Sequence, residues 1–200
     1  MFTEEIKQQI KELLNVLQDE VRITFFTDKK CPSCADGEEF IDTLVTLSDK
    51  LKLEKVETSE LVPAYEMSSV KYPDASIRFN GIPGGHEINS FLQTIVELST
   101  QASELSQEII DRIAAIEKPI DIKVFVTLGC PHCPGAVVSA NRLAMENKHV
   151  TAQMIEAQTF YDLSTKYNVS SVPKIVINDT YEFVGNQPIE KFLEGIESFK

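Results

Sequence analysis

Two copies of one short cysteine motif constrain this chain more than any other feature. Cys31-Pro-Ser-Cys34 and Cys130-Pro-His-Cys133 contain all four cysteines of the 200-residue sequence. The first cysteines of the two motifs are 99 positions apart, so each half of the chain has one motif. Each motif follows a β-rich apolar run and precedes a helical pattern, a context that indicates redox chemistry. We therefore expect two similar strand–helix junctions, each with a cysteine pair.

Hydrophobic periodicity predicts the same order of elements in both halves. In the first half we expect helices over 4–17 and from Cys34 to about 47, a short helix over 61–67 and a helix from about 86, with strands over 21–27, 52–57 and 75–79. In the second half we expect helices over 103–116, to about 146, over 159–167 and from 188, with strands over 122–128, 150–156, 174–177 and 181–184. Alternating strands and helices predict an α/β fold.

The repeat is also visible in individual residues. The run 65–70 (Tyr-Glu-Met-Ser-Ser-Val) resembles 167–172 (Tyr-Asn-Val-Ser-Ser-Val), and Ile88, Phe91 and Leu92 match three residues 101 positions later. Two copies of about 100 residues indicate a duplicated domain rather than a solenoid. We predict one unit over residues 1–100 and a second over 101–200, with the boundary in or before the helical segment 99–118.

Composition excludes several classes of partner. The formal net charge is −12, and no basic cluster interrupts it, so nucleic acid and anionic membrane surfaces are poor partners. No apolar run approaches the ~18 residues that span a bilayer. The segment Met1–Ile6 has neither the basic nor the apolar region of a secretory signal. We therefore expect a cytoplasmic protein, where paired cysteines are more often catalytic or metal-binding than structural.

The spacing within each motif suits thiol–disulfide exchange. A cysteine at a helix N-terminus lies among unpaired N–H groups, which stabilise the nucleophilic thiolate. We expect Cys130 to exchange with a substrate disulfide or dithiol and Cys133 to resolve the mixed disulfide. Cys31 and Cys34 form a second site, which relays electrons to the first or acts independently.

The two sites differ in their neighbours. His132 places an imidazole between Cys130 and Cys133, and a cation or donor there further stabilises the thiolate. The first motif has Ser33 in this position, with Lys29 and Lys30 just before it. We therefore expect the second pair to be the more oxidising.

A shared zinc site is the competing interpretation of four cysteines. The gap between Cys34 and Cys130 is 95 residues, whereas zinc ribbons usually have ~15–20 residues between their two pairs. We therefore predict no metal ligands here.

The residues around the second motif identify a resemblance. The segment from Val126 through Cys133-Pro, followed by Val172-Pro173-Lys-Ile-Val-Ile, resembles the thioredoxin superfamily. The two-unit layout resembles the glutaredoxin-like protein disulfide oxidoreductases of archaea and bacteria. The stretch 81–87 (Gly-Ile-Pro-Gly-Gly-His-Glu) is similar to one found there and in the N-terminal domain of the flavoprotein subunit of alkyl hydroperoxide reductase. The resemblance implies two tandem thioredoxin-like units, each a mixed β-sheet flanked by helices.

The resemblance also implies roles for residues outside the cysteine motifs. Pro173 would be a cis-proline facing the second pair, exposing the backbone of Val172 to an extended substrate segment. Glu87 would reach under the second site as a proton acceptor for the buried cysteine, the alternative being an ordinary acidic residue at a helix start. In the first unit the candidate cis-proline is Pro73, and the short distance from Pro73 to Gly81 predicts an incomplete hairpin.

These observations predict a protein disulfide oxidoreductase that reduces, forms or isomerises disulfides in protein substrates. The chain has no nucleotide-binding glycine motif, so we expect redox-active disulfides and no bound cofactor. Electrons from NADPH would arrive only indirectly, through a thioredoxin-reductase-like flavoprotein. Two alternatives stay open at this stage: a glutathione-dependent glutaredoxin, and a non-catalytic metal-binding or interaction module on a thioredoxin scaffold.

Overall fold

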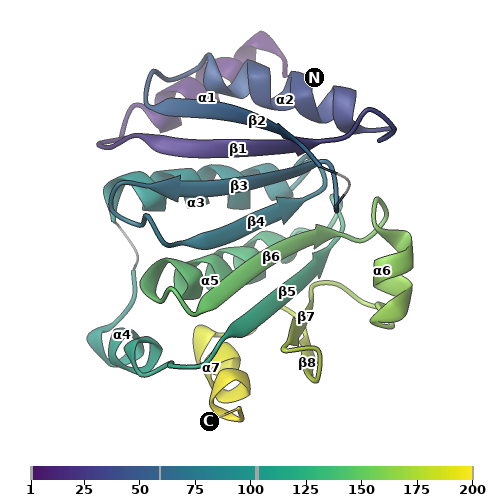
Figure 1. Cartoon of the computed structure of the whole chain (residues 1–200). Helices are drawn as coiled ribbons and strands as arrows, with labels where there is room; N and C mark the ends of the chain where they lie inside the picture. Colours follow the sequence, from purple (N-terminus) through teal and green to yellow (C-terminus); the bar gives the residue numbers. More distant parts are fainter. Residues whose placement is uncertain (1, 59, 102–103, 200) are drawn as a thin grey trace.

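The computed structural model describes residues 2–58, 60–101 and 104–199. Its elements follow the predicted order in most places (Figure 1). The first half contains α1 (Glu4–Leu14), β1 (Val21–Thr27), α2 (Cys34–Val45), β2 (Leu51–Glu57), β3 (Ala64–Ser69), β4 (Ser76–Asn80) and α3 (Glu87–Thr100). The second half contains α4 (Gln107–Ala114), β5 (Ile120–Val126), α5 (Cys133–Glu146), β6 (Val150–Glu156), α6 (Tyr161–Lys166), β7 (Lys174–Ile177), β8 (Tyr181–Val184) and α7 (Ile189–Glu197).

The eight strands form one continuous mixed sheet in the order β2-β1-β3-β4-β6-β5-β7-β8. Each half contributes four neighbouring strands with the same pattern: a parallel pair, then an antiparallel pair, then an antiparallel hairpin. The two halves join where β4 pairs in parallel with β6, with Asn80 opposite Ile155. This confirms the predicted fold class of two thioredoxin-like units, and it adds that their sheets are fused edge to edge.

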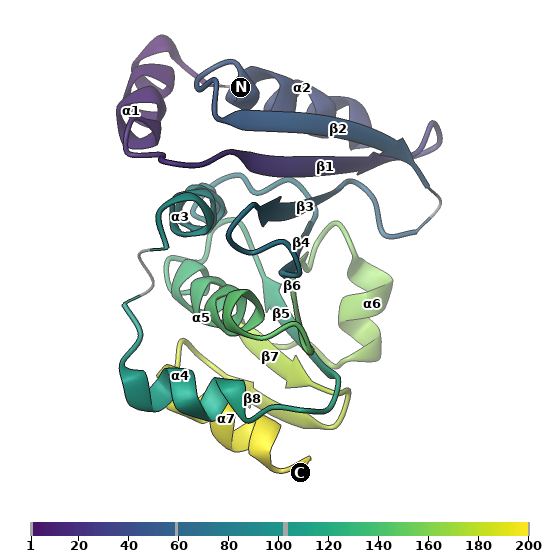
Figure 2. The same ribbon diagram turned by 60° about the vertical axis from the view of Figure 1, so that its left-hand side comes forward.

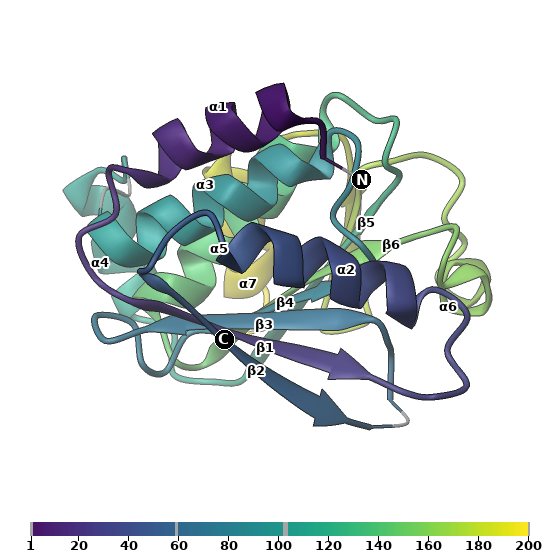
Figure 3. The same ribbon diagram turned by 90° about the horizontal axis from the view of Figure 1, so that it is seen from above.

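Most helices lie on one face of this sheet, and α6 lies on the other (Figures 2 and 3). The main core contains buried residues from α1, α2, α3, α4, α5 and α7 packed on the inward side chains of the strands. On the opposite face, Phe125, Ile155 and Val176 form a smaller cluster that is covered by residues of α6 and the loop after it. Alternation along β5 and β6 explains this division, because successive strand residues point to opposite faces.

The first unit differs from our prediction between β2 and β4. We expected a short helix over 61–67, but Ala64–Ser69 is the strand β3, and it forms a complete hairpin with β4. The expected incomplete hairpin is therefore wrong. The alternation of buried Tyr65 and Met67 with exposed Glu66 has the period of a strand. The likeness of this run to residues 167–172 is not structural, because Ala64–Ser69 is a strand whereas residues 167–172 lie between α6 and β7.

Element ends differ elsewhere by a few residues. The helix α1 ends at Leu14 rather than 17, and α4 begins after Ser106, whose hydroxyl accepts a hydrogen bond from the backbone N–H of Ile109. The predicted start of that helix at 103 lies outside the described residues. The searched residues contain no helix long and apolar enough to cross a membrane.

Candidate active sites

Both cysteine pairs lie where a strand gives way to a helix, as predicted. The first cysteine of each pair is in the turn after β1 or β5, and the second is the first residue of α2 or α5. The backbone N–H of Cys31 donates to Asp28 and that of Cys130 to Thr127, each at 3.1 Å. Both pairs are disulfides, with Cα–Cα distances of 5.4 and 5.5 Å. Each pair thus has the geometry for switching between dithiol and disulfide at a helix N-terminus.

The two cysteines of a pair differ in their accessibility. Cys31 is half-buried and Cys34 is 4% exposed, whereas Cys130 is 9% exposed and Cys133 is fully buried. The first cysteine of each motif is therefore the one that a substrate sulfur can approach. His132 is exposed and is the residue before α5.

Pro173 follows a cis peptide bond, as predicted. Its carbonyl oxygen accepts a 2.9 Å hydrogen bond from the backbone N–H of Gly185. The next residue, Asn186, packs its side chain against Gly135, where a Cβ atom would overlap it. Gly135 is two residues after Cys133, so this series of contacts brings the segment of Pro173 to the start of α5.

The first unit contributes a segment to the second site. The backbone N–H of His86 donates to the carbonyl oxygen of Leu128 at 2.9 Å, and Leu128 is two residues before Cys130. Gly85 has a φ of +55°, and a Cβ atom there would overlap the same carbonyl group. Only glycine adopts this conformation readily and allows so close an approach. The loop between β4 and α3 is therefore held against the turn that carries Cys130.

Glu87 follows this segment and is fully buried at the start of α3. Its Oε2 accepts a 2.5 Å hydrogen bond from the Ser90 hydroxyl, while its Oε1 has no hydrogen-bond partner in the described part of the chain. Burial raises the pKa of Glu87 from 4.5 to about 7, against the opposing effect of the Ser90 hydrogen bond. This carboxyl group therefore changes its charge near neutral pH.

Helix α3 packs against α5, the helix that begins at Cys133. The Asn141 amide donates to the Thr94 hydroxyl at 2.9 Å, and Arg142 of α5 forms an ion pair with Glu97 of α3 at 2.6 Å. The two helices run in the same direction, since both begin at the end of the sheet that carries the cysteines (Figure 1). Glu87, the first residue of α3, is thus at the same end of this helix pair as Cys133, the first residue of α5.

At the first site the structure corrects one predicted residue. The cis peptide bond of the first unit precedes Pro63, and Pro73 instead lies after β3 at the opposite end of the sheet. Pro63 packs against α2 one turn after Cys34, because a Cβ atom placed on Gly37 would lie 3.1 Å from the Pro63 Cβ. Pro63 also accepts a 2.8 Å backbone hydrogen bond from Gly81, as Pro173 does from Gly185.

The reason for the wrong assignment is α6, which lengthens the second unit between its second strand and its cis-proline. Pro63 is six positions after the end of β2, whereas Pro173 is seventeen positions after the end of β6, and the longer segment contains α6. A comparison that assumes equal spacing therefore passes over Pro63. The signal that could have found it is the alternating strand pattern directly after this proline.

The other neighbours of the first site are polar. The Ser33 hydroxyl is 3.9 Å from the Cys31 sulfur. Lys29 forms an exposed ion pair with Glu57 at 3.3 Å, so part of its charge is offset. Tyr65 donates a 3.0 Å hydrogen bond to the Gly37 carbonyl, and burial raises the pKa of its phenol. These contacts fix the helix turn that carries Cys34.

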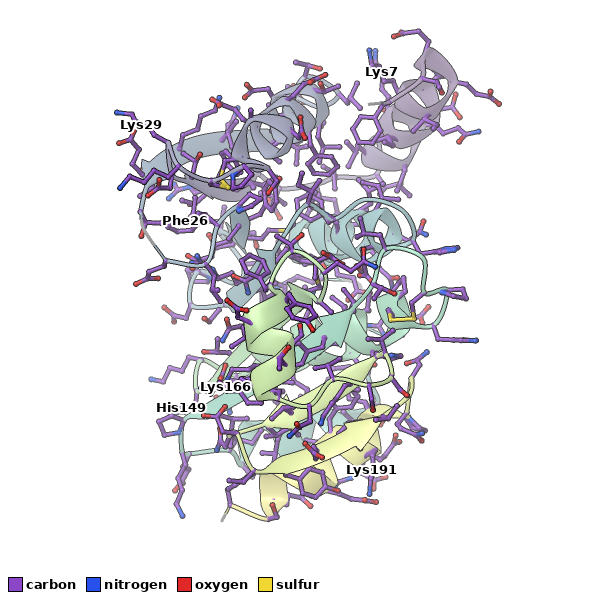
Figure 4. The ribbon with its side chains drawn as sticks, turned by 90° about the vertical axis from the view of Figure 1, so that its right-hand side faces the viewer. Lys7, Phe26, Lys29, His149, Lys166 and Lys191 are labelled. Carbon is purple, nitrogen blue, oxygen red and sulfur yellow. A yellow bond between two sulfur atoms is a disulfide. The ribbon has the colours of Figure 1, made fainter. Side chains whose placement is uncertain are left out.

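The two sites lie along the same end of the sheet but apart from each other (Figure 4). The pairings make β1 and β5 parallel, so both strands end at one edge. They are separated by four strand-to-strand steps in the order of the sheet, which is about 19 Å at ~4.8 Å per step. The strands that lead to the two disulfides are therefore not neighbours in the sheet.

Among the described residues, no group of three or more histidine, cysteine, aspartate or glutamate side chains is arranged to hold a metal ion.

Comparison with known proteins agrees with this geometry. Residues 120–198 match the family model described as a thioredoxin domain. The F component of alkyl hydroperoxide reductase from Staphylococcus aureus (strain NCTC 8325 / PS 47) is 28% identical over 202 residues, which cover 99% of this chain and 38% of that protein. A protein named NADH dehydrogenase from Ferdinandcohnia aciditolerans is 27% identical, over 97% of this chain and 37% of its own length. The chain therefore spans less than two fifths of these curated relatives.

Two solved structures match over nearly the whole chain. The NTD_N/C domain of alkylhydroperoxide reductase AhpF from Enterococcus faecalis has a TM-score of 0.90 and 25% identity, covering 98% of this chain and 100% of that one. A protein disulfide oxidoreductase from Aeropyrum pernix has a TM-score of 0.89 and 27% identity, covering 98% and 93%. The chain has the thioredoxin fold and is homologous to the N-terminal domain of AhpF proteins and to a protein disulfide oxidoreductase.

Proposed function

We propose that this thioredoxin-fold chain is a protein disulfide oxidoreductase with two sites, Cys31–Cys34 and Cys130–Cys133. One observation carries the proposal: each pair spans the last turn before a helix, and its first cysteine is more exposed than its buried second cysteine. A helix N-terminus favours a thiolate on the accessible cysteine, and the buried cysteine is close enough to resolve a mixed disulfide.

At the second site the proposed reaction is a pair of exchanges. The Cys130 thiolate attacks one sulfur of a substrate disulfide, forms a mixed disulfide and releases the other substrate sulfur as a thiolate. The Cys133 thiolate then attacks the Cys130 sulfur, forms the intramolecular disulfide and releases the second substrate thiolate. Run in reverse, the same steps transfer the disulfide to a substrate dithiol.

We propose that Glu87 receives the proton of the Cys133 thiol before the second exchange. A buried thiol resists ionisation, and a carboxylate beside it with a pKa near 7 is matched to proton transfer at neutral pH. The oxygen Oε1, which lacks a partner among the described residues, is free to accept this proton. Backbone groups of Val172 and Pro173 would hold an extended substrate segment beside Cys130.

We propose that each site exchanges with substrates on its own, because about four strand spacings separate them. We also propose a cytoplasmic location, with both disulfides reduced by a thioredoxin-reductase-like flavoprotein that uses NADPH. Homology to the N-terminal domain of AhpF proteins supports this class of electron donor.

Reduction of insulin disulfides, with glutathione and a thioredoxin reductase plus NADPH offered as competing donors, tests this proposal. We expect turnover with the flavoprotein donor and little with glutathione. Turnover supported by glutathione alone would instead favour a glutaredoxin activity. Stoichiometric metal in anaerobically purified protein, with no turnover from either donor, would overturn the proposal in favour of a metal-binding module.

A further inference from the structure

A groove lies between the segment that precedes Pro63 and the segment of α6, so its two walls come from different units. It has a volume of about 510 Å³ and is lined by Leu61, Thr159, Phe160, Tyr161, Asp162, Leu163 and Lys166. Leu61 belongs to the segment that precedes Pro63, whereas the other lining residues belong to α6 and the turn before it. Figure 4 views the end of the sheet with the two disulfides, where α6 stands in front of the ribbon. The groove therefore lies at the same end of the molecule as both cysteine pairs.

The groove is continuous with the segment that packs beside Cys34. Leu61 is two residues from Pro63, so their Cα atoms are within about 7.6 Å. On the other wall, the Phe160 ring is 3.7 Å from where a Cβ of Gly81 would lie, and Gly81 binds the carbonyl of Pro63. Arg78 donates to the Leu61 carbonyl at 3.0 Å, which fixes the backbone of this wall. A substrate segment that binds along residues 62–63 would therefore pass next to the groove.

The lining is apolar at its base and charged at its rim. Leu61, Phe160 and Leu163 are half-buried, and the Phe160 and Leu163 side chains pack on the small core beneath α6. Tyr161 is 71% exposed, which is unusual for so large a side chain. Asp162 and Lys166 are exposed at the edge and carry opposite charges. Such a lining favours an apolar side chain and offers little to a charged one.

We propose that this groove is a specificity subsite of the Cys31–Cys34 site, which binds an apolar side chain flanking the reactive cysteine of a polypeptide substrate. The proposal rests on the function proposed above. It makes the first site's choice of substrate depend on a helix of the second unit.

The test uses a Cys130→Ser/Cys133→Ser variant, in which only the first site is active. The variant is reduced with dithiothreitol, freed of reductant and mixed with a disulfide-linked peptide dimer. One turnover oxidises Cys31 and Cys34 to a disulfide and releases two peptide thiols. Two dimers are compared that differ only in the residue before cysteine, leucine or aspartate. We expect the leucine peptide to react about tenfold faster, as is ordinary for one apolar group in a pocket.

Variants in the groove then connect the preference to its residues. Leu61→Asp is expected to remove the preference, and Tyr161→Lys, a change at an exposed position, is expected to reverse it toward the aspartate peptide. The readout is the ratio of the two rates, because a general loss of thiol reactivity lowers both rates equally. Val70→Asp is the matched control, since Val70 is 75% exposed and lies after β3 at the opposite end of the sheet. It should retain the tenfold ratio.

The possible failures are distinguishable. Equal rates for the two peptides in the starting variant, or a ratio that survives Tyr161→Lys, would overturn the subsite while leaving the proposed function intact. The small reagent 5,5′-dithiobis(2-nitrobenzoic acid), which needs no groove, reports on the reactivity of the pair itself. If the reduced variant does not react with this reagent, the proposed function fails at the first site and the subsite fails with it.

Discussion

The backbone N–H of His86, in the first unit, donates a 2.9 Å hydrogen bond to the carbonyl oxygen of Leu128, in the turn before Cys130. This contact makes the second active site a product of both units. It fixes the start of α3, and with it the buried carboxyl group of Glu87, at the end of α5 that carries Cys133. A defect in the first unit can therefore change the chemistry of the second.

The first prediction concerns Gly85, which permits this contact. Gly85→Ala should destabilise the protein by more than ~1 kcal/mol, because alanine is strained at positive φ and its Cβ would overlap the Leu128 carbonyl. Urea unfolding measures this loss. Gly129→Ala is the matched control, since a Cβ on Gly129 would have no atom within 4 Å, and it should change stability little. Equal stability of the two variants would show that the loop adapts without cost.

A second prediction follows from the buried carboxyl group. Since the pKa of Glu87 is raised from 4.5 to about 7 on folding, the folded state binds this proton more tightly than the unfolded state. Its stabilising effect is complete below pH 4.5 and is lost as the pH rises through 7. Glu87→Gln should therefore match the wild type near pH 4 and be about 3 kcal/mol more stable at pH 8, at ~1.4 kcal/mol per pH unit. Denaturant unfolding across this range gives the difference.

The same substitution should slow the second exchange at Cys130. Glutamine cannot accept the Cys133 proton, so release of the mixed disulfide should fall by roughly 100-fold at pH 8, within the range of general base catalysis. Rapid-quench trapping of the mixed disulfide measures this rate. Exchange at Cys31–Cys34 in the same variant serves as the internal control and should not change. Normal release with altered stability would leave Glu87 a purely structural residue.

The third prediction concerns the difference between the two pairs. His132→Ser should raise the pKa of Cys130 and lower the reduction potential of its pair. If the imidazole lowers the thiolate pKa by two units, or ~2.7 kcal/mol, the change is up to ~60 mV. Redox titration against glutathione measures it, with the Cys31–Cys34 potential as the reference in the same sample. An unchanged potential would mean that the helix terminus alone sets the energy of the thiolate.

The fourth prediction ranks the sites. Cys130→Ser should reduce insulin turnover more than Cys31→Ser does. The hairpin and the cis-proline do not support this ranking, because both units have them. The ranking depends instead on Glu87 and His132 at the second site. A larger loss in Cys31→Ser would show that the greater exposure of Cys31 matters more than these neighbours.

The sequence alone determined the elements that depend on local pattern. Strand and helix periods located β1, β6, β7 and β8 at their observed residues, and the two motifs marked both strand–helix junctions. The prediction of a cis bond before Pro173 is confirmed, because the spacing after that motif matches the family it resembles. The same reasoning failed at Pro73, since α6 makes the spacing of the second unit longer than that of the first, whose cis-proline is Pro63.

Only the tertiary structure decided how the units share their sites. Pairing of β4 with β6 fuses the two sheets, and it brings His86 to Leu128 and the segment of Leu61 to α6. These contacts join residues that are tens of positions apart, and they depend on which sheet edges meet. Periodicity reports only which face of an element is buried. The choice of neighbouring edge comes from packing summed over many residues, which no local pattern records.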